Sequence, residues 1–193
     1  MFCAVLIVSA SASGQNPKAG SARWAELTNI DSYAKKVDQF IKGNQKTLRI
    51  FANVSSGTSS APDQWREFKS EDERQNADTG ENLNENANVW LHAGKVVGAN
   101  FTFQSPSRDW AQLVMYYFRE DGTLAKIQSR LNTFYGDMTV TREKFYGANG
   151  RLLRTTKTCF DLKSQKPKVC AGFTDESIPA FRSVQTLPFY KFL

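Results

Sequence analysis

Few side chains in this sequence could do chemistry, and the first to consider are two pairs of neighbouring acids. Glu120-Asp121 and Asp175-Glu176 are pairs of the kind that support glycoside hydrolysis, in which one carboxyl protonates the leaving group while the other acts as nucleophile or base. Because adjacent residues of a strand point to opposite faces, neither pair forms a site by itself. A carboxylate-based hydrolase of extracellular polymers is therefore an alternative that requires one essential acid between residues 105 and 122.

A nucleophilic mechanism would depend wholly on the single histidine, His92. This residue stands beside an expected Ala93-Gly94 turn, which is a poor place for a buried base. The sequence contains no G-x-S-x-G elbow, phosphate-binding loop, dinucleotide fingerprint, H-E-x-x-H or C-x-x-C. We therefore assign no catalytic residue and no cofactor. No metal site is expected either, because one histidine and so few cysteines do not supply four convergent ligands.

The segment Ser105–Trp110 places a basic, an acidic and an aromatic side chain, Arg108, Asp109 and Trp110, before a strongly apolar strand. Loops held by rigid strands often carry binding groups, so these three residues are candidates for a binding site. Arg108 and Asp109 are equally compatible with an ion pair local to the turn. Both interpretations stay open at this point.

Aromatic residues make up 12% of the chain, and such residues favour the half-buried surface of a sheet. Alternation along residues 95–104 predicts that Trp90, Phe101 and Phe103 share one face, and Tyr116 lies on the next strand, which is apolar on both faces. These aromatic side chains either line a cavity for an apolar ligand or form an ordinary core beneath a helix.

Cys159 and Cys170 are the two cysteines that remain once a leader carrying Cys3 is set aside. A turn centred on Ser164-Gln165 would place them opposite each other on neighbouring strands, at about the 4.5–5.5 Å between Cβ atoms that suits a disulfide. The sequence thus predicts a Cys159–Cys170 disulfide, as expected in an oxidising compartment.

The N-terminal residues 1–12 are uncharged and apolar and end in Ala10-Ser11-Ala12, the form of a signal-peptidase site. The run is too short to span a membrane, which needs about 20 residues. We expect a signal peptide at 1–12, a flexible stalk at 13–21 and a single β-rich domain at 22–193, secreted or periplasmic and not transmembrane. No positive charge precedes the apolar run, so the start of the precursor either lies upstream or the chain is a fragment. A buried N-terminal strand is the other interpretation.

Two segments precede the strands. Apolar residues recur at spacings of three and four and predict one amphipathic helix, broken near residue 30 and ended by Gly43. The apolar residues of this pattern are Trp24, Leu27, Ile30, Ala34, Val37, Phe40 and Ile41. Residues 55–87 are polar and acidic, and we expect a loop there, with a possible short helix from Trp65 to Arg74 in which Trp65 and Phe68 share a face.

From residue 89 onward, apolar runs are separated by turn dipeptides, namely Ala93-Gly94, Asp121-Gly122, Gly136-Asp137 and Asn149-Gly150. Asp-Gly and Asn-Gly between apolar runs are strong hairpin signals. The expected fold class is α+β and β-dominated: the N-terminal helix packs on a curved antiparallel β-meander of about six to eight strands, shaped as a half-barrel or cone.

A short unit repeats within the meander: Phe118 to Leu124 (FREDGTL) and Tyr146 to Leu152 (YGANGRL) align as aromatic-x-x-[Asp/Asn]-Gly-x-Leu. This unit resembles the hairpin units of MORN- and YD-type β-repeats, although two copies are too few for a solenoid. The leader, helix and meander together resemble uncharacterised exported bacterial proteins. That resemblance covers about residues 88–162 and implies no activity.

The formal charge of +6 is unevenly distributed, with +4 on residues 1–62, −5 on 63–85 and +7 on 86–193. For an exported protein, an anionic envelope polymer or lipid is a better partner than nucleic acid, and a solvated face is the simplest interpretation. Our leading hypothesis is a non-enzymatic binding module for an apolar small molecule, a lipid or an envelope partner. An envelope scaffold that binds anionic polymer is a further alternative to the hydrolase.

Overall fold

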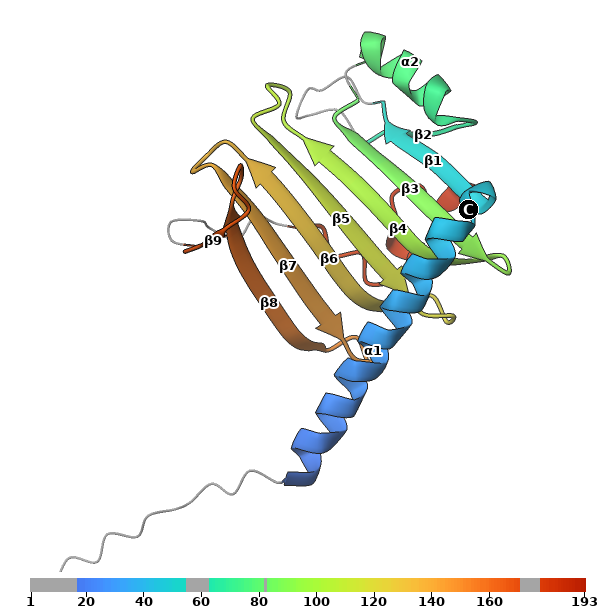
Figure 1. Ribbon diagram of the computed structural model, residues 1–193. Coiled ribbons are helices and arrows are strands. Elements are labelled where there is room, and N and C mark those ends of the chain that lie inside the picture. The colour runs from blue at the N-terminus through green and yellow to red at the C-terminus, as the bar shows by residue number, and fades with distance from the viewer. Residues whose placement is uncertain (1–16, 55–62, 82, 171–177) are drawn as a thin grey trace, which may run out of the picture.

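The computed structural model describes residues 17–54, 63–81, 83–170 and 178–193 (Figure 1). The described chain forms α1 (Pro17–Gly43), β1 (Leu48–Asn53), β2 (Trp65–Phe68), α2 (Glu71–Glu81), β3 (Glu85–His92), β4 (Lys95–Gln104), β5 (Trp110–Phe118), β6 (Leu124–Thr133), β7 (Met138–Tyr146), β8 (Leu152–Asp161) and β9 (Pro167–Lys168). Three short 3-10 helices are η1 (Gln45–Thr47), η2 (Val184–Thr186) and η3 (Tyr190–Phe192). The signal peptide expected at 1–12 lies outside the described residues.

The strands form one antiparallel sheet in the order β2-β1-β3-β4-β5-β6-β7-β8-β9, so every strand from β3 onward pairs with the next along the chain. The β-dominated α+β meander with a helix on one face is therefore confirmed. The strand number is nine rather than six to eight, because the acidic segment and the region after β8 each supply a short edge strand. The sheet is neither closed nor strongly curled (Figure 1), which corrects the expected half-barrel or cone.

The helix α1 is continuous from Pro17 to Gly43. Its buried face consists of Leu27, Ile30, Ala34 and Val37, as the spacing predicted, and there is no break near residue 30. It begins within the segment expected as a stalk at 13–21. Trp24, which was included in the apolar face, is 66% exposed, because the first turns of α1 extend beyond the sheet (Figure 1).

The acidic segment expected as a loop at 55–87 contains β2, α2 and the start of β3. Trp65 and Phe68 lie in a strand, and they join two different core clusters because residues three apart in a strand point to opposite faces. Ser70 caps α2 by accepting a hydrogen bond from the Glu73 amide over 3.1 Å. The sequence Ser-Glu-Asp-Glu at 70–73 is the usual signature of such a helix start.

The expected hairpin turns are present, and Ala93 and Gly94 both have positive φ, 49° and 75°, as a two-residue hairpin turn requires. An uninterrupted ladder from this turn would pair Trp90 with Val97, but Trp90 pairs with Gly98 because the ladder shifts by one residue between Trp90 and Leu91. This irregularity puts Trp90 and Val97 in the core cluster beneath α1. Phe101 lies in the cluster on the opposite face, so the prediction that Trp90 shares a face with Phe101 and Phe103 is wrong.

The face of the sheet opposite α1 is covered by the C-terminal segment, residues 178–193. Its side chain Phe189 is fully buried and stacks on Phe51, with ring centroids 4.3 Å apart. β5 is buried on both sides, as predicted, with Tyr116 beneath the C-terminal segment and Tyr117 beneath α1. The C-terminal segment covers the aromatic side chains on this face of the sheet. An open sheet can therefore bury these side chains without closing into a barrel.

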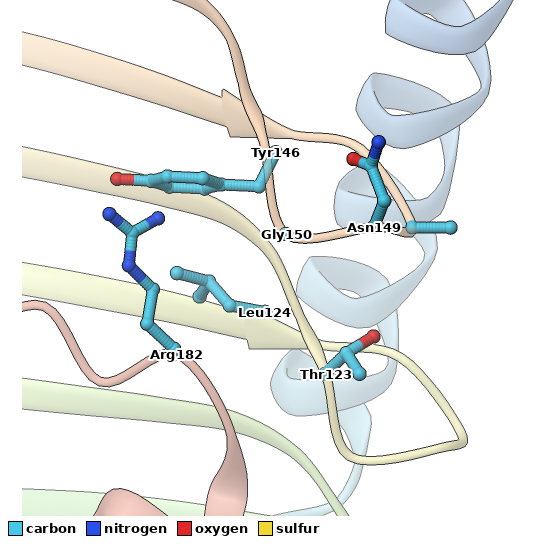
Figure 2. Close-up of a pocket in the computed structure, with 7 residues that line it drawn as sticks. Thr123, Leu124, Tyr146, Asn149, Gly150 and Arg182 are labelled. Atoms are coloured by element: carbon cyan, nitrogen blue, oxygen red, sulfur yellow. The ribbon is translucent and has the colours of Figure 1, made fainter.

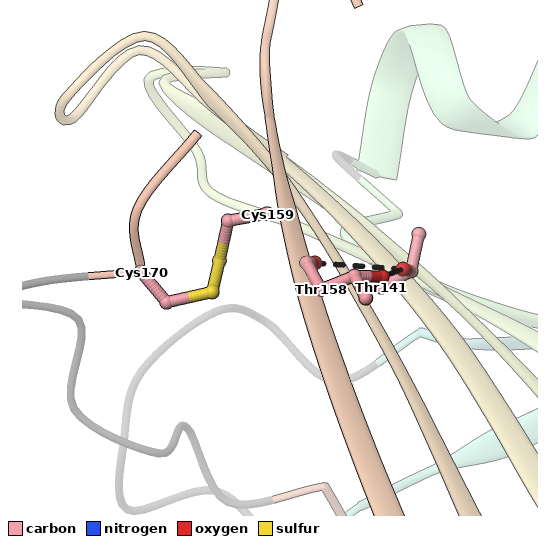
Figure 3. The surroundings of a disulfide bond; sticks show 4 residues. All are labelled: Thr141, Thr158, Cys159 and Cys170. Carbon is pink, nitrogen blue, oxygen red and sulfur yellow. Dashed lines mark hydrogen bonds between the residues drawn. A yellow bond between two sulfur atoms is a disulfide. The ribbon is translucent and has the colours of Figure 1, made fainter. Parts of the chain in front are cut away.

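The predicted disulfide joins Cys159 and Cys170, with 5.4 Å between the Cα atoms (Figure 3). The two cysteines are not directly opposed, because Cys159 pairs with Lys168 and Cys170 lies beyond the end of β9. On the β7 side, the hydroxyls of Thr141 and Thr158 are hydrogen-bonded at 2.5 Å (Figure 3). The disulfide ties the chain just before residues 171–177 to the edge of the meander.

Candidate functional site

A hollow on the described surface lies between α1 and the β3–β4 hairpin. We call it the α1 groove, and its volume is about 480 Å³, within the roughly 300–1,000 Å³ usual for ligand sites. Its lining residues are Tyr33, Lys36, Val37, Phe40, His92, Ala93, Lys95, Val97 and Glu120. The helix supplies the first four, the hairpin the next four, and the β5–β6 turn supplies Glu120.

Helical periodicity explains how α1 contributes to this groove. Tyr33, Lys36, Val37 and Phe40 are three or four residues apart, so they lie along one side of the helix. The hairpin supplies His92 and Lys95, which pair directly across the turn, as the two-residue loop predicted. The ring of His92 meets the ring of Phe40 edge to face, with centroids 4.9 Å apart, and this contact joins the two walls.

The close approach of α1 to the sheet at Gly98 sets the depth of the groove. A Cβ atom built on Gly98 would lie 2.6 Å from Cε of Met115 and 3.3 Å from Cδ1 of Ile41. A larger residue here would press on Met115 and on Ile41 of the helix, so glycine favours this close approach. Val37 and Val97, both buried, therefore form an apolar floor rather than a gap.

The rim of the groove is polar and mainly basic. The side chains of Lys36, His92 and Lys95 are exposed, and so is the single acid, Glu120. Tyr33 is half-buried, and its hydroxyl donates to the backbone carbonyl of Phe118. Burial, reinforced by the negative charge of Glu120, raises the pKa of Tyr33 above its usual value of 10.0, so Tyr33 acts here as a neutral hydrogen-bonding group.

Glu120 stands at a junction of hollows. A neighbouring hollow of about 370 Å³ shares Tyr33 and Glu120 with the α1 groove, and one of about 260 Å³ on the C-terminal side shares Lys95 and Glu120. The turn that carries Glu120 is held by Arg119, whose guanidinium donates to the carbonyls of Leu124 and Tyr146 at 2.6 and 2.5 Å. The carboxylate of Glu120 is thus presented from a fixed backbone.

A separate hollow of about 300 Å³ lies beside the β7–β8 turn (Figure 2). Here the guanidinium of Arg182 lies over the ring of Tyr146, with its carbon 4.5 Å from the ring centroid. The backbone carbonyl of Arg182 accepts from the Leu124 amide at 3.0 Å. These contacts attach the C-terminal segment to the sheet. The side chains of Arg182 and Tyr146 are therefore already paired with each other at this hollow.

Three of the aromatic residues predicted to bind a ligand form a core with the C-terminal segment. Phe101 contacts the rings of Phe103, Tyr116, Phe181 and Phe189, with centroids 5.0–5.8 Å apart. The hydroxyl of Tyr116 donates to the carbonyl of Pro179 at 2.7 Å. Trp90 is buried beneath α1 instead. Trp90, Phe101 and Tyr116 thus belong to core clusters and Phe103 packs against one of them, while the prediction that they bind a ligand stays a prediction.

The other predicted group lies at the opposite end of the sheet from the α1 groove: Arg108 and Asp109 are in the loop between β4 and β5, and Trp110 is the first residue of β5. Ser105 organises this loop, because its Oγ accepts from the amides of Asp109 and Trp110 at 2.8 and 3.3 Å. Asp109 accepts from the Ser107 hydroxyl at 2.5 Å. In the part of the chain that the structure describes, Arg108 and Asp109 form no ion pair with each other.

The first acidic pair does not converge on one point. Asp121 accepts from both the hydroxyl and the amide of Thr123, at 2.6 and 2.9 Å, within its own turn. These hydrogen bonds lower the pKa of Asp121 below its usual value of 3.8, so it stays ionised as a turn residue while Glu120 lines the groove. The second pair, Asp175-Glu176, lies outside the described residues.

Within the described ranges, no group of three or more His, Cys, Asp or Glu side chains is placed to share a metal ion. No helix among the same residues is both long and apolar enough to cross a membrane.

The α1 groove was not predicted from the sequence. Val37 and Phe40 were predicted on the helix face, and His92 was predicted beside the Ala93-Gly94 turn, which Lys95 follows. What was missing was the crossing of α1 over the end of that hairpin, which is a tertiary contact. The Gly98 position between apolar residues was the one available signal, since a strand glycine often marks a close approach.

Comparison with protein-family models, with curated proteins and with solved structures finds no match for this chain.

Proposed function

We propose that this protein is a non-enzymatic binding module that holds an amphipathic ligand, with an apolar body and an acidic end, in the α1 groove. The observation that carries the proposal is the combination of an apolar floor, Val37 and Val97, with exposed cations at the rim, Lys36 and Lys95. An apolar ligand chain would replace water on the floor, and its anionic end would pair with the lysines. Such a division between apolar lining and a few polar groups is typical of small-molecule sites.

The aromatic core is not assigned to this site. Its rings are already packed against Phe181 and Phe189 of the same chain, so a ligand there would first have to displace the C-terminal segment. The α1 groove requires no such displacement. The proposal retains an exported location, because disulfides such as Cys159–Cys170 persist mainly in oxidising compartments.

The test is calorimetric titration with two probes of equal chain length and opposite charge, decanoate and decylamine. Decanoate should bind more tightly than decylamine. Replacing both rim lysines, in Lys36→Gln/Lys95→Gln, should weaken decanoate binding by about tenfold, as expected when two partly exposed ion pairs are lost. Both side chains are exposed, so the variant should fold normally.

The matched control is Lys42→Gln/Lys46→Gln, which removes two exposed lysines near the C-terminal end of α1 that do not line the groove. It should bind decanoate as the wild type does. Equal affinity for the two probes, or loss of binding in the control as well, would refute the proposal. Native mass spectrometry of the purified protein adds an independent test, because a bound amphiphile gives an extra mass that organic extraction removes.

A further inference from the structure

A second surface lies at the corner of the sheet farthest from the α1 groove, where β6 turns into β7. The turn Phe134–Asp137 exposes two neighbouring aromatic side chains, with Phe134 66% and Tyr135 77% accessible. Single exposed aromatic residues need no explanation. Two adjacent aromatic residues at the tip of a turn form an exposed apolar surface, because neither ring belongs to a core cluster of the described chain.

The backbone of this turn is held on both sides. The Phe134 amide donates to the carbonyl of Asp109 at 3.0 Å, and the Leu162 amide donates to the carbonyl of Asp137 at 2.9 Å. The Lys168 ammonium donates to the carbonyl of Gly136 at 2.7 Å. The β4–β5 loop, the β6–β7 turn and the β8–β9 turn therefore form one connected tip, which we call the aromatic tip (Figure 1). Its rings are presented from a rigid frame.

The β8–β9 turn gives this tip a basic flank. Lys163, Lys166 and Lys168 are all exposed in it. The one acid at its base, Asp161, is engaged within the turn, where its Oδ1 accepts from the Lys163 and Ser164 amides at 3.2 and 2.8 Å and its Oδ2 lies 3.9 Å from Nζ of Lys168. Lys168 is therefore held by the tip itself, and Lys163 and Lys166 are the exposed cations beside the aromatic turn.

The charge of the surrounding strands extends this flank. Residues 124–170, which contain β6 to β9, carry ten basic and three acidic side chains, a net charge of +7. The whole chain has a net charge of +6, so this half of the meander accounts for all of the excess. Lys126 and Arg142 are buried, and the other eight basic side chains still outnumber the three acids, so the positive charge of this part of the chain is complementary to an anionic partner.

We propose that the aromatic tip docks the protein on an anionic lipid bilayer, with Phe134 and Tyr135 entering the interfacial layer and Lys163 and Lys166 contacting headgroups. Aromatic side chains prefer the membrane–water interface, and basic residues gain energy near anionic headgroups. A soluble anionic polymer would use the lysines but would give the two exposed rings no apolar medium to enter. This inference is independent of the α1 groove, which lies at the other end of the sheet.

Vesicle flotation with the full chain tests the proposal. Vesicles of phosphatidylcholine alone are compared with vesicles in which about a third of the lipid is phosphatidylglycerol, at low and high salt. Wild-type protein should float with the anionic vesicles at low salt and much less with the neutral ones. Phe134→Ser/Tyr135→Ser should lower partitioning by at least about tenfold, since each ring loses its apolar surroundings. Lys163→Gln/Lys166→Gln should lower it by about fivefold for each lysine removed.

The matched control is Trp24→Ser, which removes an aromatic side chain of similar exposure, 66%, from the first turns of α1. It should float as the wild type does. If the lysine variant loses binding while the aromatic variant keeps it, the partner is recognised by charge alone, as an anionic polymer would be, and the bilayer proposal is overturned. Equal flotation with neutral and anionic vesicles also overturns it. Phe134→Ser and Tyr135→Ser are made singly as well, so that misfolding of the double variant leaves the test intact.

Discussion

Lys126 of β6 and Asp31 of α1 form an ion pair, with Nζ and Oδ1 2.9 Å apart, that ties the helix to the sheet. The same ammonium lies 2.7 Å from Oε1 of Glu143 on β7 and 4.8 Å from the ring centroid of Phe145. The Lys126 side chain is only 6% exposed, whereas those of Asp31 and Glu143 are 37% and 32% exposed. One buried cation thus holds two half-solvated acids from different elements.

Lys126→Met should destabilise the protein by about 1–3 kcal/mol, less than the loss of a partner in a fully buried pair, because both acids keep contact with water. The ion pair with Lys126, and to a lesser degree that with Lys35, holds the pKa of Asp31 below its usual value of 3.8. A lowered folded-state pKa adds stability that is present above about pH 4 and is lost as the pH falls through the folded value.

Urea denaturation of the wild type and Lys126→Met between pH 7 and pH 2.5 checks this prediction. The difference in unfolding free energy should be constant near neutrality and should shrink below about pH 4. A difference that stays the same down to pH 2.5 would show that the pair with Asp31 contributes nothing.

Phe189→Ala should destabilise the protein by about 3–5 kcal/mol, as is usual for truncating a fully buried aromatic side chain. The ring of Phe189 is 0% exposed and lies against Phe51, Trp65 and Phe101. Phe192→Ala is the matched comparison in the same segment, and at 37% exposure it should cost less than about 2 kcal/mol. Thermal unfolding and limited proteolysis of the C-terminal segment compare the stability of the two variants. If Phe189→Ala and Phe192→Ala destabilised the protein equally, the segment would not form the core described.

Gly98→Ala and Gly98→Val test the approach of α1 to the sheet. Alanine should destabilise by about 1 kcal/mol, because the tip of Met115, 2.6 Å from the new Cβ, can move aside. Valine should cost about 3 kcal/mol, since its branches meet Ile41 and Val37 of the helix, the nearest atoms after Met115. Denaturant unfolding gives both values, and a valine variant as stable as the wild type would contradict the close contact.

Cys159→Ser/Cys170→Ser should lower the unfolding free energy by about 2–3 kcal/mol, the amount expected for a loop closed over a sequence separation of 11. The measurement is urea unfolding of the variant against the oxidised wild type, with the reduced wild type as the control that leaves the sequence unchanged. Intact mass under non-reducing conditions should be two hydrogens below that of the reduced chain. Two free thiols in protein purified without reductant would disprove the disulfide.

Much of the local structure could be predicted from the sequence alone. The helix face from Leu27 to Val37, the turn at Ala93-Gly94 and the pairing of His92 with Lys95 all follow from periodicity and turn chemistry, which act between residues a few positions apart. The Cys159–Cys170 disulfide was predictable for the same reason, although its register was not. Ser70 and Glu73 form a helix-start signal that predicts α2, but the polar and acidic composition of this segment led to the expectation of a loop.

The remaining features depend on contacts between distant parts of the chain. One ladder shift near Trp90 decides which aromatic residues lie beneath α1, because a change of one residue sends a side chain to the other face. The return of Phe181 and Phe189 over Phe101 decides that the aromatic face is core. The α1 groove, likewise, exists only because the helix crosses the end of the β3–β4 hairpin. The sequence determined which elements form and which of their faces are apolar, and the tertiary structure decided which apolar faces meet, since that choice rests on packing between segments far apart in the sequence.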